Sequence, residues 1–385
     1  MIKKLLQNNL NFFFGSLSIS INFFFSSILI IFLSLFDYLD LAAELGLTVS
    51  ITLFLCQIFS ANHRSLLYLK EYENSFYAIV QFRSLISVLI IIISLFFISI
   101  LKFEYQLFLM ITSILICIQW ILEIFLTIKE KEKNSNYLNT ILLINIFVFS
   151  IIIIAIFFDN IFFINFLMLF LIGTYLLIFK NEFKKLKLNI KDLVLAKNTF
   201  NSSLKNYEII SSFFLNFSNL IWRFSIFIFA GKLAAGLLFG SYALGSFFGT
   251  IYYNILGPRI HSKKIILSKI WFILFFFLTI LLIFVSFNYL QNFNDIFEFD
   301  HVRINCILFS LSGSLIMMLS LFIRFNYFYN RQTKFIFKLD ILYSILISFV
   351  ILIIFLFFGL KYFVLAYFIA SLCSLSVYSL VFLKK

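Results

Sequence analysis

Charged side chains are scarce in this chain, and their scarcity excludes a water-soluble fold. Only 12% of the residues are Asp, Glu, Lys or Arg, whereas 63% are hydrophobic; a soluble domain carries about 25% charged residues. Many apolar runs exceed the ~18 residues that indicate a membrane-spanning helix. Strands of a membrane barrel are short and alternate in polarity, which these runs do not. We therefore expect an all-α polytopic membrane protein.

Residues that build catalytic and metal sites are equally rare. The sequence has no glycine-rich phosphate loop, no paired histidine ligands and no supported Ser–His–Asp set, so we expect no catalytic residues and no enzyme activity. The cysteines lie inside apolar segments without ligand spacing, and we interpret them as small core residues; they are Cys56, Cys117, Cys306 and Cys373. We accordingly expect no metal site and no cofactor.

The apolar runs predict twelve spans, with a polar stretch after the sixth. The predicted spans are 10–36, 45–67, 76–100, 106–128, 138–158, 161–179, 207–230, 233–256, 265–289, 304–327, 335–358 and 360–382. They divide the chain into an N-terminal six-helix bundle (1–179), a basic cytoplasmic linker (180–206) and a C-terminal six-helix bundle (207–385).

Basic residues alternate from one side of these spans to the other. Of the 30 Lys and Arg residues, 24 fall in one set of connecting segments, termini and adjoining span ends, four fall in the alternate set, and two, Arg83 and Arg223, lie deeper within spans. Because Lys and Arg stay on the cytoplasmic side, both termini are expected in the cytoplasm. The net charge of +13 is then explained by contacts with anionic lipid headgroups, and we expect no nucleic-acid partner.

The two halves show a faint internal similarity. LAAELG (41–46) follows the first span and LAAGLLFG (233–240) follows the seventh. An even number of spans per half requires a parallel pseudo-repeat, although so short a match also arises by chance.

Glycine is concentrated in one place. Six of the 11 glycines lie between Gly231 and Gly257, and the only proline, Pro258, is expected to end that helix. Gly236 and Gly240 share one helix face and Gly245 and Gly249 share the opposite one, so the helix is expected to pack closely between two neighbours. Static packing and sliding against a neighbour both remain open.

Ionisable residues inside spans are the candidate functional residues, because they are costly in lipid and usually face a cavity or a partner. Arg223 lies among Asn216, Ser218, Asn219 and Trp222; it either lines a cavity or extends to the outer headgroups. Arg83 and Glu123 lie at similar depth and are expected to pair. That pair is either static or opened when Glu123 takes a proton.

Residues near the cytoplasmic ends are weaker candidates. His63, Arg64 and Arg324 either cap their helices in solvent or contribute to a site. Asp340 is expected at the interface. Asn22 and neighbouring serines give the first span a polar face, which suits either a central cavity or static hydrogen bonding between helices.

The chain resembles the multidrug/oligosaccharidyl-lipid/polysaccharide (MOP) exporter superfamily, and within it the polysaccharide (O-antigen, Wzx-type) flippases. The resemblance covers the whole chain and is carried by the two six-span halves, the basic central loop, LAAELG (41–46) and AGKLAAGLLFGSYALGSFF (230–248). It implies two bundles in a MATE-like arrangement around a central cavity, in the bacterial cytoplasmic (inner) membrane. It also implies transfer of undecaprenyl-pyrophosphate-linked oligosaccharide, a repeat unit of O-antigen, lipopolysaccharide or capsule, from the inner to the outer leaflet by alternating access.

The resemblance assigns expected roles to the candidates. Arg83 and Arg223, with Arg64 and Arg324, would bind the pyrophosphate; Glu123 and His63 would couple transport to protons or sodium. Membrane lipids and a polysaccharide polymerase are the expected partners. Two alternatives remain: a MATE-type cation-coupled drug antiporter, and a polysaccharide polymerase or lipid-linked glycosyltransferase.

Overall fold

The structure, a computed structural model, describes residues 18, 21–22, 24–60, 67, 76–132, 135–184, 207–261, 299–329, 333–358 and 365–380. Within these ranges every regular element is helical, and no strand occurs there. Seven helices of the described part are long and apolar enough to cross a membrane. The all-α, multi-pass class expected from the composition is therefore confirmed.

The described chain forms two compact units. One comprises Met1–Ser26 and Thr48–Phe213, and the other comprises Ser27–Leu47 and Phe214–Lys385. The division falls inside α2 (Leu39–Ser60), so the first residues of this helix belong to the second unit and the remainder to the first. A division of the chain at the linker 180–206 stays a prediction.

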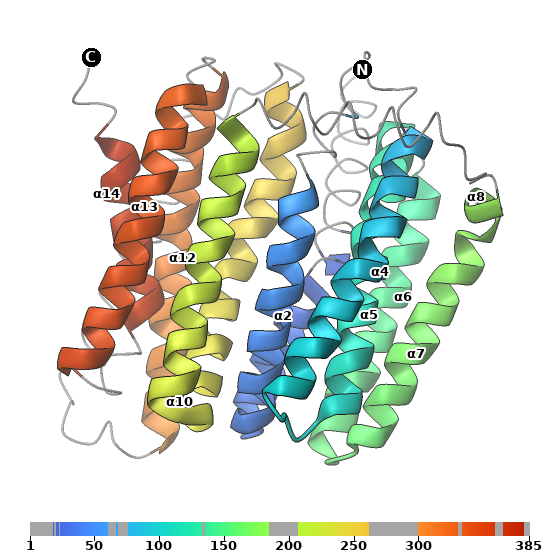
Figure 1. Ribbon diagram of the computed structural model, residues 1–385, viewed down its shortest axis with the longest axis horizontal. Helices are drawn as coiled ribbons and strands as arrows, with labels where there is room; N and C mark the ends of the chain where they lie inside the picture. Colours follow the sequence, from blue (N-terminus) through green and yellow to red (C-terminus); the bar gives the residue numbers. More distant parts are fainter. Residues whose placement is uncertain are drawn as a thin grey trace, which may run out of the picture. The chain divides into compact units, whose positions relative to one another are not determined.

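The first unit is a bundle of long helices. It contains α4 (Phe76–Ile100), α5 (Gln106–Lys131), α6 (Ser135–Phe157), α7 (Ile161–Ile178) and the short α8 (Lys180–Lys184). As Figure 1 shows, α4 to α7 run side by side, and α5 packs against α4, α6 and α7. Large apolar side chains, among them Ile92, Phe147 and Phe166, are exposed on the outside of this bundle. An apolar surface of this kind promotes aggregation in water, whereas it can pack favourably against the acyl chains of a bilayer.

The second unit contains α10 (Tyr207–His261), α12 (Phe299–Tyr329), α13 (Thr333–Ile353), the π-helical turn η3 (Ile354–Phe358) and α14 (Ala366–Ser379). Helix α14 packs against both α12 and α13, and these helices lie together in Figure 1.

Helix α10 is a helical hairpin that reverses at Gly231. The rings of Trp222 and Tyr242 have centroids 4.8 Å apart, whereas an uninterrupted helix would separate these residues by about 30 Å. Gly231 lies at the reversal with φ 83° and ψ 171°, a conformation that is essentially confined to glycine. The break falls between the spans predicted at 207–230 and 233–256.

The glycines in the second arm of this hairpin, which follows Gly231, pack against other parts of the protein on two opposite faces of the helix. A methyl group on Gly236 would lie 2.0 Å from the carbonyl oxygen of Leu39, and one on Gly240 would lie 2.3 Å from Cβ of Ser34. On the other face, a methyl group on Gly245 would lie 2.3 Å from the ring of Tyr367. These small residues let backbone and rings approach closely, as packing in lipid requires.

Two predicted boundaries are wrong. The second span was expected over 45–67, but α2 begins at Leu39. The helix accommodates two acids before residue 45: Asp40 lies in the first turn, where a carboxylate is favoured, and Glu44 forms an ion pair with Lys232. The eighth span was predicted over 233–256, with Pro258 just past the helix end, but α10 continues to His261, so the proline only removes one hydrogen bond in the last turn.

The predicted span at 265–289 lies outside the described residues, so twelve spans stay a prediction.

Candidate functional site

Arg83 and Glu123 form a buried ion pair in the first unit. Arg83 lies on α4 and Glu123 on α5, with Nη1 of the arginine 2.7 Å from Oε2 of the glutamate. The Arg83 side chain is 1% exposed and that of Glu123 is 13% exposed. The pairing expected from the sequence is confirmed, and the Arg83 side chain is buried inside the bundle.

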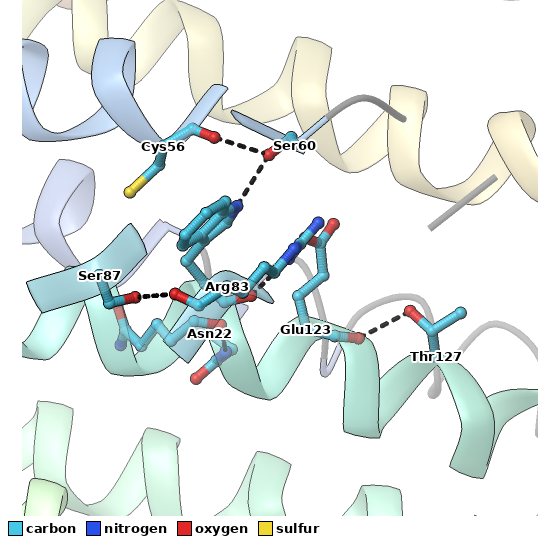
Figure 2. A network of polar contacts seen from close by, with 9 residues as sticks. Asn22, Cys56, Ser60, Arg83, Ser87, Glu123 and Thr127 are labelled. Carbon is cyan, nitrogen blue, oxygen red and sulfur yellow. Dashed lines mark hydrogen bonds and ion pairs between the residues drawn. The ribbon is translucent and has the colours of Figure 1, made fainter. Parts of the chain in front are cut away.

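Trp120 holds the arginine from a second direction. Nη1 of Arg83 donates a hydrogen bond to the backbone carbonyl of Trp120, and its guanidinium carbon lies 4.7 Å from the centre of the indole ring. The indole N–H donates to Oγ of Ser60 at 2.7 Å, which orients the ring from α2. Figure 2 shows Arg83 and Glu123 directed toward one another, with Ser60 nearby. The cation is thus satisfied by a carboxylate, a carbonyl and an aromatic face.

A neutral polar cluster in the same unit joins four helices. The Tyr175 hydroxyl on α7 donates to Oδ1 of Asn22 at 2.9 Å and also contacts Oδ1 of Asn145 on α6. Nδ2 of Asn22 donates to the Gln119 carbonyl on α5. All four side chains are buried. Asn22 was expected on a polar face, whereas Tyr175 was missed because nothing marks one tyrosine among 18.

Arg223 is surrounded by aromatic rings in the second unit. Its guanidinium carbon lies 5.3, 5.5 and 5.6 Å from the ring centres of Trp222, Phe239 and Tyr242. Nη1 also donates to the carbonyl of Gly46 at 3.3 Å. Ring faces within about 6 Å attract a cation. The two arms of the hairpin therefore hold this arginine between them.

We call the rings of Trp222, Phe239 and Tyr242 around Arg223 the aromatic cage. Asn219 holds two of these rings in place through hydrogen bonds. Its Oδ1 accepts a hydrogen bond from the indole N–H of Trp222 at 3.2 Å and one from the hydroxyl of Tyr242 at 3.4 Å. Of the polar residues noted around Arg223 in the sequence, Asn219 supports the rings, whereas Ser218 donates to the carbonyl of Ser344.

Arg324 and Asp340 make a bidentate ion pair between α12 and α13. Nε and Nη2 of the arginine donate to Oδ1 and Oδ2 at 3.0 and 2.8 Å, and the hydroxyl of Tyr378 on α14 also donates to the carboxylate. Asp340 is 0% exposed, so it lies inside the protein, while its expected depth near the membrane interface stays a prediction. The bidentate fit is the geometry that Arg and carboxylate favour, and it commits both oxygens to Arg324.

Glu44 is a buried acid that sequence reasoning missed. It is 0% exposed, and its Oε1 lies 2.7 Å from Nζ of Lys232, which is 32% exposed. The position of Glu44 inside LAAELG could have signalled it, since an acid within an apolar run needs a partner.

The remaining predicted site residues are not placed. His63 and Arg64 lie outside the described residues, and Gly249 lies on α10 at a point where side-chain surroundings are not described. Across the described ranges, no three His, Cys, Asp or Glu side chains gather as metal ligands.

Comparison with known proteins gives no match: no protein-family model, no curated protein and no solved structure is detectably similar to the chain. The site geometry therefore carries the functional argument alone.

Proposed function

We propose that this protein is a flippase that moves undecaprenyl-pyrophosphate-linked oligosaccharide from the inner to the outer leaflet of the bacterial cytoplasmic membrane. The observation that carries the proposal is the placement of Arg223, a guanidinium held between aromatic rings inside a membrane-spanning hairpin. Aromatic faces attract a cation, and a buried guanidinium held in this way is the group that we propose to receive the anionic headgroup.

The chemistry of the guanidinium suits the headgroup. Its planar fork of N–H donors matches two phosphate oxygens at once, and it stays charged when buried. A pyrophosphate group is strongly anionic, so it needs such a partner to enter a bilayer. Arg223 would therefore hold the headgroup, and Arg64, which the sequence predicts at the cytoplasmic end of its span, would help to collect it.

Arg83 supports the same function in a different way. It is neutralised by Glu123 at 2.7 Å, so it binds an incoming phosphate only after that carboxylate is protonated. Uptake of one proton by Glu123 would leave a buried cation without its counterion and raise its affinity for phosphate. This exchange gives a physical route for proton coupling. Sodium coupling would instead require the carboxylate to stay charged.

Arg324 has less freedom, because its Nε and Nη2 both donate to the carboxylate of Asp340. Its role in the proposal is therefore structural, and substrate binding falls to Arg83, Arg223 and Arg64.

A MATE-type drug antiporter is the principal alternative, because it would use buried acids to hold cations. Among the described residues, the candidate acids Glu44, Glu123 and Asp340 are each paired with a base: Glu44 with Lys232, Glu123 with Arg83 and Asp340 with Arg324. These pairs leave little net negative charge for a cationic drug. A polymerase or lipid-linked glycosyltransferase is the less favoured alternative. A polysaccharide polymerase is instead proposed as a partner of this protein.

The test is complementation of a strain in which the gene is deleted. Arg223→Gln should abolish surface polysaccharide and accumulate lipid-linked oligosaccharide in the inner leaflet, whereas Arg223→Lys should retain part of the export because it keeps the charge without the fork. Both variants must reach the membrane in normal amounts. Full export by Arg223→Gln would remove Arg223 from the mechanism, and drug sensitivity without a polysaccharide defect would favour the antiporter.

A further inference from the structure

Cys56 and Cys117 face one another between α2 and α5 in the first unit. The two helices are joined by hydrogen bonds on either side of the cysteines: Thr52 donates to Ser113 at 3.4 Å, and Trp120 donates to Ser60 at 2.7 Å. Cys56 lies four residues after Thr52 and Cys117 four residues after Ser113, so each cysteine follows one helical turn along the same face. The bracketing contacts fix the register that brings the thiols together.

The two thiols are buried, and charged and polar groups lie near them. Both cysteines are free, and they are 0% and 1% exposed. The Cys56 thiol is within interaction range of the Cys117 thiol and of the guanidinium of Arg83. Figure 2 shows Cys56 one turn before Ser60, whose hydroxyl donates to the Cys56 carbonyl.

We propose that Cys56 and Cys117 form a two-coordinate site for a soft monovalent metal ion of the Cu(I) and Ag(I) class. Soft thiolate ligands select such ions over Mg²⁺, Ca²⁺ and Mn²⁺, which prefer oxygen. Zn²⁺ is disfavoured as well, because its structural sites need four ligands and no third His, Cys, Asp or Glu joins this pair in the described part of the chain.

Charge balance makes this site compatible with the membrane interior. On binding, one thiol gives its proton to water and its sulfur bonds the metal, while the second sulfur donates a lone pair and keeps its proton. One positive charge enters as one leaves, so the net charge of the site does not change. No electron is transferred, and the charges of the neighbouring Arg83–Glu123 pair still cancel one another.

The ion would bridge α2 and α5 next to Trp120. It would then add a link between two helices that are joined there by the Thr52–Ser113 and Ser60–Trp120 hydrogen bonds. This site is independent of the flippase proposal, since it requires no oligosaccharide and no transport.

The experiment measures binding of Ag(I) to the purified full-length protein in detergent, with chloride-free buffer and silver nitrate as the probe. The background variant Cys306→Ser/Cys373→Ser retains only the proposed pair and should bind one Ag(I) per chain. Adding Cys56→Ser or, separately, Cys117→Ser should weaken binding by more than about 100-fold, since even outer-shell partners of a metal are worth 10–100-fold. Quenching of tryptophan emission should follow the same stoichiometry and be lost with Trp120→Phe.

Two results would overturn the proposal. One is a background variant that binds no Ag(I) with micromolar or better affinity while remaining monodisperse. The other is undiminished binding in Cys56→Ser or Cys117→Ser. If a serine variant fails to fold, Cys56→Ala and Cys117→Ala serve in its place, because alanine removes the thiol without adding a buried hydroxyl.

Discussion

The guanidinium of Arg83 lies 2.7 Å from the carboxylate of Glu123, and both side chains are inside an apolar bundle. Breaking such a pair leaves an uncompensated buried charge, whereas removing both members together does not. This asymmetry separates the stabilising role of the pair from its role in transport.

Glu123→Gln should therefore destabilise the protein by about 3–5 kcal/mol. The double variant Arg83→Met/Glu123→Met should recover most of that stability and yet lose transport. Thermal unfolding in detergent, followed by loss of the monodisperse peak, measures the first effect, and complementation measures the second. A double variant no more stable than Glu123→Gln would show that the pair does not act as a charge-balanced unit.

The cage around Arg223 depends on ring faces. Tyr242→Leu removes one face and should lower stability by about 0.5–2 kcal/mol and reduce export, whereas Tyr242→Phe keeps the ring and removes the hydroxyl that donates to Asn219. The matched control is Phe229→Leu, which changes an exposed aromatic residue on the same hairpin. Equal effects of Tyr242→Leu and Tyr242→Phe would argue against a cation–π contribution.

Close packing at Gly236 can be tested with a single methyl group. Gly236→Ala places Cβ 2.0 Å from the backbone oxygen of Leu39. A backbone atom cannot move aside as a flexible side chain does, so we expect a large fall in melting temperature. Gly173→Ala on α7 is the control, because its methyl group would have nothing within 4 Å. The control should be neutral or stabilising by up to about 1 kcal/mol, and similar melting temperatures for the two variants would contradict the packing.

Substitution of Gly231 is also expected to destabilise the protein, but for a different reason. Nothing lies within 4 Å of a methyl group there, but φ is +83°, so Gly231→Ala should cost about 1–3 kcal/mol through backbone strain alone. Asparagine is tolerated in the ordinary left-handed helical region but not at ψ 171°, so Gly231→Asn should be as damaging. A stable Gly231→Asn variant would mean that the hairpin reverses in another conformation.

The predicted orientation is tested by reporter fusions. Green fluorescent protein fused after Lys385 should fluoresce, because the carboxyl terminus is expected in the cytoplasm. Alkaline phosphatase inserted after Lys102 should be active, because that connection is expected on the outer side. Inactive phosphatase at Lys102 together with a dark terminal fusion would reverse the orientation.

The sequence by itself determined the class of the protein and the position of most helices. Runs of Phe, Ile and Leu leave no other way to satisfy the backbone in lipid, and α4 matches its predicted span, 76–100, at both ends. The similar depth of Arg83 and Glu123 in their predicted spans was also enough to predict their ion pair.

Only the tertiary structure decided which faces meet. In water an amphipathic stripe marks the buried side of a helix, but lipid is as apolar as leucine, so the packing faces of these helices carry no such mark. For that reason the partners of Glu44 and Asp340, and the meeting of Cys56 with Cys117, could not be read from spacing along the chain. Each depends on the register between helices, which close packing and a few polar contacts set.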